Sequence, residues 1–192
     1  MSNTPLDDDE TDGLIPDHIV NRAGLNEWEA LNIARAHEWL SRRRGRDVLD
    51  VSFLRALHRQ MFGSTWKWAG EFRRSDKNIS PHPWSAVAAL TEELVRDVHA
   101  QYQSSVKAPD EVDEIVARFH HGLVRIHPWP NGNGRHARLA ADLLLEQWGS
   151  PPFTWGGSGD LAAVGAARAA YIRALRRADA GEFGPLREFV RS

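Results

Sequence analysis

Residues 126–138, IHPWPNGNGRHAR, join two segments of helical character. Upstream, apolar residues recur at steps of three and four over residues 112–126, which predicts one face of an amphipathic helix. Downstream, residues 139–148 are mostly apolar and predict a buried central helix. Pro128 disfavours the helical conformation at His127, so the first helix should end just before that histidine. The stretch therefore predicts a histidine on a short rigid loop that ends at a helix N-terminus.

The charges at the start of the second helix point to a bound anion. The first turn of a helix normally carries Asp or Glu, because the macrodipole makes that end positive. Here it carries Arg135, His136 and Arg138, and each cation should cost about 0.3–1 kcal/mol. Backbone N–H groups of residues 132–134 can hold phosphate oxygens, and the two guanidinium groups can neutralise them. The alternative is an ordinary helix-loop-helix with solvated arginines, which the fixed spacing of His, Pro, Gly and Arg disfavours.

The stretch from His127 to Arg135, HPWPNGNGR, resembles the signature HPFx(D/E)GNGR of the Fic/Doc family. Arg138 stands at the position of that family's second arginine. Two positions depart from the pattern. Trp129 replaces the usual Phe and should keep the buried aromatic anchor. Asn131 stands where most members have an acidic magnesium ligand, and this change bears on the mechanism.

The resemblance implies transfer of a nucleoside monophosphate, usually AMP from ATP, onto a Ser, Thr or Tyr hydroxyl of a target protein. His127 is the implied general base, which takes the proton of that hydroxyl. The residues implied to bind the nucleotide are Asn131, Gly132, Asn133, Gly134, Arg135 and Arg138. Asn131 is also the implied metal ligand. Because an amide brings no charge, Mg²⁺ or Mn²⁺ should be held mainly by the nucleotide phosphates, and activity should be weakened or altered.

Two other functions stay open at this point. A Doc-like branch of the family transfers the terminal phosphate of ATP and has Asn at the position of Asn131, but it lacks the GNGR ending that this chain keeps. A non-catalytic Fic module that binds nucleotide or protein is favoured only by Asn131. The intact His127 and the two arginines argue for an enzyme.

Residues 66–79, WKWAGEFRRSDKNI, have aromatic and β-branched residues around a glycine and a polar turn cluster, which predicts a short hairpin or an extended loop. The segment resembles the WxWAGxFR sequence that leads into a β-hairpin flap in Fic proteins. Such a flap holds the target by adding a strand to it. Asp76, Lys77, Asn78 and Ile79 are therefore expected to line the target groove. An ordinary surface hairpin is the alternative.

Periodicity and capping residues predict a mainly α fold of the Fic type, with about six to seven helices and a β-hairpin flap beside the active-site loop. Asn26 followed by Glu29 suggests a capping box for the first helix, and Asp50 and Ser85 are the expected N-caps of the second and third helices. The expected helices lie at residues 26–43, 50–62, 85–102, 110–126, 160–180 and 185–190, in addition to the helix after the motif. Residues 1–13 are acidic and predict a mobile tail, so residues 14–192 should form a single Fic-type domain. The loop over residues 149–159, which carries Phe153 and Trp155, is expected to pack under the core; the alternative is that it borders the nucleotide base.

The 24 basic and 26 acidic residues give a net charge of -2, which argues against direct nucleic-acid binding and against a membrane partner. The chain has no cysteine, no long apolar run and no signal-peptide pattern, so the cytoplasm is the expected location.

The inhibitory pattern (S/T)xxxE(G/N) of many Fic proteins does not occur in the sequence. The protein is therefore either unrestrained or restrained by an inhibitor supplied in trans. Residues 4–7, 66–70 and 76–78 resemble most the bacterial Fic group called mobile mystery protein B. That resemblance implies a small helix-turn-helix protein as a companion.

Overall fold

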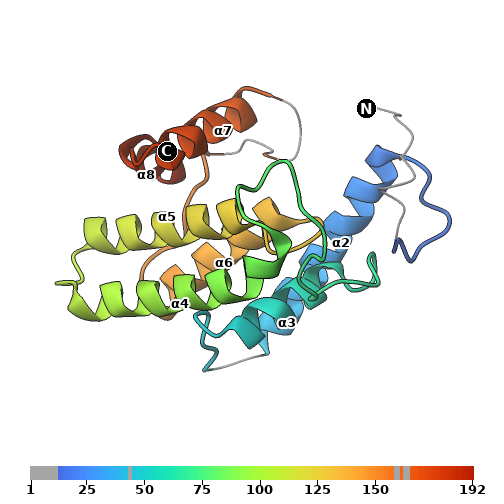
Figure 1. The fold of residues 1–192 in the computed structure, drawn as a ribbon, viewed down its shortest axis with the longest axis horizontal. Coiled ribbons are helices and arrows are strands. Elements are labelled where there is room, and N and C mark those ends of the chain that lie inside the picture. Colours follow the sequence, from blue (N-terminus) through green and yellow to red (C-terminus); the bar gives the residue numbers. More distant parts are fainter. Residues whose placement is uncertain (1–12, 43–44, 158–160, 162–164) are drawn as a thin grey trace.

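The computed structural model describes residues 13–42, 45–157, 161 and 165–192 (Figure 1). Within these residues the chain forms seven α-helices and one 3-10 turn, which confirms the mainly α class. The helices are α2 (Arg22–Ser41), α3 (Val51–Phe62), α4 (Val87–Ser104), α5 (Pro109–Ile126), α6 (Asn133–Gln147), α7 (Ala166–Asp179) and α8 (Gly184–Val190), and the 3-10 turn is η1 (Trp84–Ala86).

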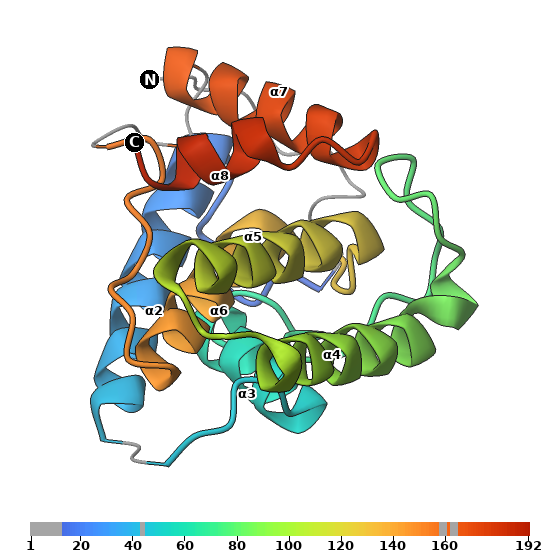
Figure 2. The same ribbon diagram turned by 90° about the vertical axis from the view of Figure 1, so that its left-hand side faces the viewer.

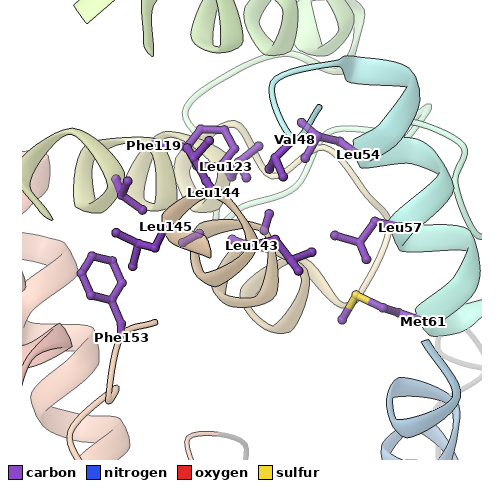
Figure 3. Close-up of a cluster of buried hydrophobic side chains, with 14 of the residues drawn as sticks. Val48, Leu54, Leu57, Met61, Phe119, Leu123, Leu143, Leu144, Leu145 and Phe153 are labelled. Atoms are coloured by element: carbon purple, nitrogen blue, oxygen red, sulfur yellow. The ribbon is translucent and has the colours of Figure 1, made fainter. Parts of the chain in front are cut away.

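Helix α6, which follows the motif loop, is the central helix. Helix α5 runs along one side of α6 and α3 contacts another (Figure 2). Leu143, Leu144 and Leu145 point in different directions from α6 and are all buried (Figure 3). They contact side chains from both neighbouring helices and from the loop after α6, and the cluster includes Leu54, Leu57, Met61, Phe119, Leu123 and Phe153. A helix that is apolar on several sides is stable only when it is enclosed, as the sequence predicted.

Helix α2 starts earlier than expected, at Arg22. Its N-cap is Asn21, whose side-chain oxygen accepts a hydrogen bond from the backbone N–H of Gly24 at 2.9 Å. The predicted capping box at Asn26 is therefore wrong, and Glu29 is buried within the helix instead. The carboxylate of Glu29 accepts from the indole Nε1 of Trp66 at 2.9 Å and pairs with Arg135 rather than with the start of its own helix.

The other helix boundaries agree with the sequence in part. Asp50 caps α3 as expected and accepts from the N–H of Ser52 at 2.7 Å. Ser85 does not cap α4, because η1 precedes it and Asp76 accepts the N–H of Trp84 at 2.7 Å. Helix α7 is described from Ala166, and its expected start at residue 160 lies outside the described residues. Of the tail expected over residues 1–13, residues 1–12 also lie outside them, and the carbonyl of Gly13 accepts from the N–H of Lys67 at 2.9 Å.

The β-hairpin expected over residues 66–79 does not form in the structure. Within the described part of the chain the one β-bridge is an isolated antiparallel pair between Leu14 and Trp66. The aromatic residues of the segment pack against other rings instead of alternating between the two faces of a strand. The ring centroids of Trp66 and Trp68 are 4.9 Å apart, and those of Phe72 and Trp129 are 5.1 Å apart. The aromatic residues that had predicted a strand in this segment are therefore present because they pack in the core.

The C-terminal helices α7 and α8 lie beside α5 and are tied to the loop after α6 (Figure 2). The guanidinium group of Arg191 pairs with Asp113 and donates to the carbonyl of Pro152 at 2.9 Å. Phe153 is buried in the core, as expected, while Trp155 is half-buried. Among the described helices, none combines the length and the apolar character that crossing a membrane requires.

Candidate active site

His127 lies at the point where α5 ends and is the C-cap of that helix. Its N–H still donates to the carbonyl of Leu123 at 3.1 Å, but its own backbone is left-handed, with φ 55° and ψ 60°. The following Pro128 excludes the helical conformation here, as the sequence predicted. A left-handed residue other than glycine costs roughly 1–2 kcal/mol, so contacts elsewhere must hold this turn.

Arg73 supplies those contacts, and sequence reasoning missed it. The side chain is buried, and its Nε donates to the carbonyl of His127 at 2.8 Å. The two terminal nitrogens of the side chain donate to the carbonyls of Ser75 at 2.8 Å and His82 at 2.7 Å. The backbone N–H of Arg73 donates to the carbonyl of Pro128 at 2.8 Å. One buried guanidinium therefore joins the flap segment to the loop that carries the histidine.

The imidazole of His127 is neutral at physiological pH. Its pKa is lowered to about 4, mainly by burial and to a smaller extent by the positive charges of Arg73 and Lys77, while the carbonyl of Val124 acts in the opposite direction. A neutral imidazole has a free lone pair and can accept a proton. The residue is therefore in the protonation state that a general base requires.

Trp129 is the anchor of the motif loop and is fully buried. Its ring stacks between those of Phe72 and His58, with centroid distances of 5.1 Å and 4.4 Å. Its indole Nε1 donates to Nδ1 of His136 at 3.2 Å, so the proton of His136 sits on Nε2, which donates to the carbonyl of Leu54 at 3.0 Å. The indole thus has a hydrogen-bond function that a phenylalanine at this position lacks.

His136 does not act as a first-turn cation, contrary to the expectation from sequence. Burial lowers its pKa to about 4, so the ring is neutral, and only Arg135 and Arg138 bring positive charge to the start of α6. Sequence alone could not show this, because the ring is buried by residues far from it in the chain.

His58 is a second buried neutral histidine that supports the loop. Its Nδ1 accepts from the N–H of Gly70 at 2.9 Å, so Nε2 carries the proton and donates to the carbonyl of Asn131 at 3.1 Å. Burial holds its pKa well below the usual value, in keeping with these two bonds. His58 therefore connects α3, the turn at Gly70 and the motif loop.

The loop residues before α6 shape a small backbone cradle. Gly132 has φ +80°, and an added Cβ would lie 2.6 Å from the ring of Phe62, so only glycine fits. The side chain of Asn133 is buried and bonds the backbone of Trp129 twice. Its Oδ1 accepts from the N–H of Trp129 at 2.9 Å, and its Nδ2 donates to the carbonyl of Trp129 at 2.8 Å. The first backbone N–H groups of α6, from Asn133 to Arg135, have no acceptor within the helix and are available to an anion.

The side chain of Asn131 also takes part in the cradle. Its Oδ1 accepts from the N–H of Gly132 at 2.7 Å. This oxygen is the one that Asn131 can offer to a metal ion, and one of its lone pairs is already used. A single neutral oxygen is a weak ligand for Mg²⁺, which prefers carboxylates and phosphates.

The two arginines of the motif face a groove between α2 and α6 with a volume of about 440 Å³. The guanidinium of Arg135 pairs with Glu29 at 2.6 Å and lies 5.2 Å from the ring of Phe62. That of Arg138 lies 5.8 Å from the ring of Tyr171. The groove is lined by Asn26, Ala30, Ile33, His37, Met61, Arg135, Arg138, Leu139, Asp142 and Trp155. The structure thus brings both predicted arginines to one surface next to the cradle.

The predicted flap residues form an irregular loop. The side chain of Asp76 is exposed and accepts the N–H of Trp84, and the carbonyl of Lys77 accepts from the N–H of Ser80 at 3.0 Å. Asn78 is exposed, and Ile79 is 71% exposed, which is unusual for an isoleucine. Lys77 lies near enough to His127 to lower its pKa. The loop therefore borders the histidine, as expected, but without the hairpin.

The family model described as the Fic/DOC family matches residues 48–145, about half of the chain, and the match includes the loop, the cradle and both arginines. The chain therefore belongs to the Fic/DOC family, which confirms the resemblance seen in the sequence.

Curated relatives include "Protein adenylyltransferase Fic" of Drosophila melanogaster, which is 30% identical over 150 residues, or 76% of this chain and 27% of that protein. The same protein of Drosophila ananassae is 30% identical over 150 residues. The chain spans about a quarter of the length of these relatives.

Solved structures show the same fold at low identity. The N-terminal Fic domain of Bep8 from Bartonella sp. 1-1C superposes with a TM-score of 0.73 and 16% identity, covering 91% of this chain and 88% of that one. BepC from Bartonella tribocorum, solved with bound AMPPNP, gives a TM-score of 0.68 at 16% identity, covering 96% and 97%. The architecture is therefore the Fic fold.

Proposed function

We propose that this protein transfers AMP from ATP to a Ser, Thr or Tyr hydroxyl of a target protein. The observation that carries the proposal is a neutral histidine, His127, at the edge of a helix N-terminus whose free N–H groups and two arginines can hold phosphates. The curated relatives are named protein adenylyltransferases, which supports the same reaction.

The reaction needs a base and a positioned leaving group. The target hydroxyl oxygen forms a bond to the α-phosphorus of ATP, the bond between that phosphorus and its oxygen bridge to the β-phosphate breaks, and pyrophosphate leaves. The hydroxyl proton passes to the imidazole of His127. The polyphosphate is negatively charged and raises the pKa of this imidazole once it binds, which makes it a stronger base in the complex.

Charge stabilisation falls to the start of α6. The backbone N–H groups of Asn133, Gly134 and Arg135 point along the helix axis toward the cradle and favour negative charge there. The guanidinium groups of Arg135 and Arg138 neutralise the phosphates next to it. Pre-aligned donors of this kind need no rearrangement as charge moves onto the leaving pyrophosphate, which lowers the barrier.

We assign to Asn131 a reduced role in metal binding. Mg²⁺ or Mn²⁺ would neutralise phosphate charge when bound, and the nucleotide phosphates would supply most of its ligands. The Oδ1 atom of Asn131 already accepts from Gly132, so it contributes at most one further neutral ligand. Weaker binding of the metal ion, or a changed metal preference, is consistent with this donor set.

Residues Asp76 to Ile79 are the proposed contact with the target protein. The loop borders His127, and its backbone is irregular, so pairing with an extended target segment would order it into a strand. The exposed Ile79 offers apolar surface to that segment. We propose that residues 14–192 act as one catalytic unit in the cytoplasm, with an inhibitor or a helix-turn-helix companion supplied in trans.

Labelled ATP tests the proposal. Wild type, His127→Ala and a control variant, His99→Ala, are incubated with a bacterial lysate, Mg²⁺ or Mn²⁺, and ATP labelled at the α- or the γ-phosphate. His99 is an exposed histidine on α4, so its loss should leave activity unchanged. Label from α-ATP that disappears only in His127→Ala is the expected result.

Other outcomes refute AMP transfer. Label from γ-ATP alone indicates a Doc-like kinase reaction. No label from either position, with ATP binding retained, indicates a non-catalytic module or another nucleotide, and a repeat with the other nucleoside triphosphates distinguishes these two.

A further inference from the structure

We propose that Tyr171 of α7, backed by His120 of α5, is a positioning residue for Arg138, so that α7 forms part of the nucleotide site. The inference rests on the proposed function, because it concerns how one phosphate-binding arginine is held. It adds a residue that lies after the segment matched by the family model, which ends at residue 145.

The side chain of Arg138 connects the cradle to α7. Helical side chains lean toward the start of their own helix, and Nη1 of Arg138 lies 3.8 Å from the position that a Cβ on Gly134 would occupy. The guanidinium therefore reaches the cradle, where Gly134 leaves room for it. The same guanidinium lies 5.8 Å from the ring centroid of Tyr171. Arg138 is half-buried and lines the groove, so part of it stays open to phosphate.

Tyr171 is fixed in the interior by its ring and by its hydroxyl. The residue is 6% exposed, and its ring lies 5.7 Å from that of Phe189 in α8. Its hydroxyl bonds Nε2 of His120 at 2.9 Å. Burial raises the pKa of the phenol to about 12, while the positive charge of Arg138 and its hydrogen bond with the phenol act in the opposite direction. The phenol is thus neutral, and its oxygen lies between an imidazole and a guanidinium.

His120 decides which way the phenol hydrogen points. The imidazole is fully buried and neutral, because burial lowers its pKa to about 3, and the carbonyl of Ala137 favours a proton on the ring. Since Nε2 faces Tyr171, and Nδ1 has no other partner among the described residues, the ring proton sits on Nδ1. Nε2 is then an acceptor, and the phenol O–H donates to it. The lone pairs of the phenol oxygen remain for Arg138, which has only donors.

A neutral acceptor aligns an arginine without cancelling its charge. Arg135, by contrast, pairs with the carboxylate of Glu29. The carboxylate of Asp142, one helical turn beyond Arg138, accepts from the indole N–H of Trp155 at 3.0 Å. Arg138 therefore keeps its charge for the polyphosphate. Because the phenol already holds the guanidinium in place, less side-chain freedom is lost when the nucleotide binds.

Direct binding measurements test the inference without relying on transfer. Calorimetry follows the binding of inorganic tripolyphosphate and of ATP to wild type, Tyr171→Phe, Arg138→Met and the double variant. Phe keeps the ring that packs on Phe189 and removes only the hydroxyl. Tyr102→Phe is the matched control, because Tyr102 is the other tyrosine of the chain and stacks on Trp148, at the opposite end of α6 from the cradle.

We expect Tyr171→Phe to weaken tripolyphosphate binding about threefold or more, and Arg138→Met about tenfold or more. The double variant should be within about twofold of Arg138→Met alone, because the hydroxyl acts through that arginine. Tyr102→Phe should stay within about twofold of wild type. A hydroxyl that only stabilised the fold would leave the binding of tripolyphosphate unchanged.

Nitrogen NMR of the His120 ring is a second readout, and it needs neither a ligand nor a variant. Near neutral pH, Nδ1 should resonate as a protonated nitrogen and Nε2 as an unprotonated one. If Tyr171→Phe does not fold by circular dichroism, His120→Gln and His120→Leu replace it. Gln keeps an acceptor for the phenol and Leu removes it, so His120→Gln should bind tripolyphosphate more tightly than His120→Leu.

Unchanged binding by Tyr171→Phe would overturn the inference, as would an undiminished effect of that substitution in the Arg138→Met background. A proton on Nε2 of His120, or equal binding by the two His120 variants, would overturn it as well. A wild type that binds neither ligand would overturn the inference together with the anion site. A wild type that binds both but transfers no AMP would refute the proposed function and leave the role of Tyr171 standing.

Discussion

Replacing Trp129 by the phenylalanine usual in the family should destabilise this protein. Trp129 is fully buried, and its indole N–H is the donor to Nδ1 of His136 at 3.2 Å. In Trp129→Phe that nitrogen keeps its lone pair but loses its donor. A buried acceptor without a partner costs about 1–3 kcal/mol. The smaller ring also leaves space between the rings of His58 and Phe72, which adds about 1 kcal/mol or more.

The free energy of unfolding should therefore fall by about 2–4 kcal/mol in total. Urea unfolding at pH 7 measures it, and with a slope of about 1–3 kcal/mol per molar urea the midpoint should fall by about 1 M or more. The pKa of His136 should also rise from about 4, because the indole N–H no longer opposes a proton on Nδ1. Histidine ring resonances in NMR follow this titration.

Trp84→Phe is the matched control, since Trp84 is 48% exposed and the same change there should stay within about 0.5 kcal/mol. If Trp129→Phe lowers the urea midpoint no more than Trp84→Phe does, the indole hydrogen bond contributes nothing to stability. The account of how this family member uses tryptophan would then be wrong.

Three further predictions concern the reaction. Burial holds the pKa of His127 at about 4 in the nucleotide-free enzyme, which is the form that kcat/KM for ATP reports, so kcat/KM for ATP should be flat from pH 8 to pH 5. A base with a pKa of 6.5 would lose about thirtyfold by pH 5, and a fall in kcat/KM centred near pH 6.5 would contradict the prediction. Arg73→Met should lower kcat at least tenfold with little change in the KM for ATP, because it frees the backbone of His127 and not the phosphate site; an unchanged kcat would refute that role. Asn131→Asp should lower the Mg²⁺ concentration needed for half-maximal ATP binding about tenfold, measured by magnesium titration, and equal dependence in both proteins would show that residue 131 does not touch the metal.

The tertiary structure alone decided several features of the site. Glu29 matched a capping pattern in sequence, yet it is a buried partner of Arg135, more than a hundred residues away. His136 matched a cation at a helix start, yet burial by Trp129 and Leu54 makes it neutral. Arg73 was only the last residue of the WxWAGxFR segment in the sequence and was assigned no role, yet its buried side chain holds the motif loop.

The sequence by itself determined the features that depend on neighbours along the chain. The end of α5 before His127 follows from Pro128, the start of α3 follows from Asp50, and the conformation of Gly132 follows from its lack of a side chain. These backbone preferences are set by residues close together in the chain, so they can be predicted from the sequence. The hairpin prediction failed for the opposite reason, because Phe72 and its aromatic neighbours are used by the core. The burial of a side chain, its protonation state and its ion-pair partner depend on residues that are distant in the chain and meet only in the folded protein. The tertiary structure therefore decided these properties of the site.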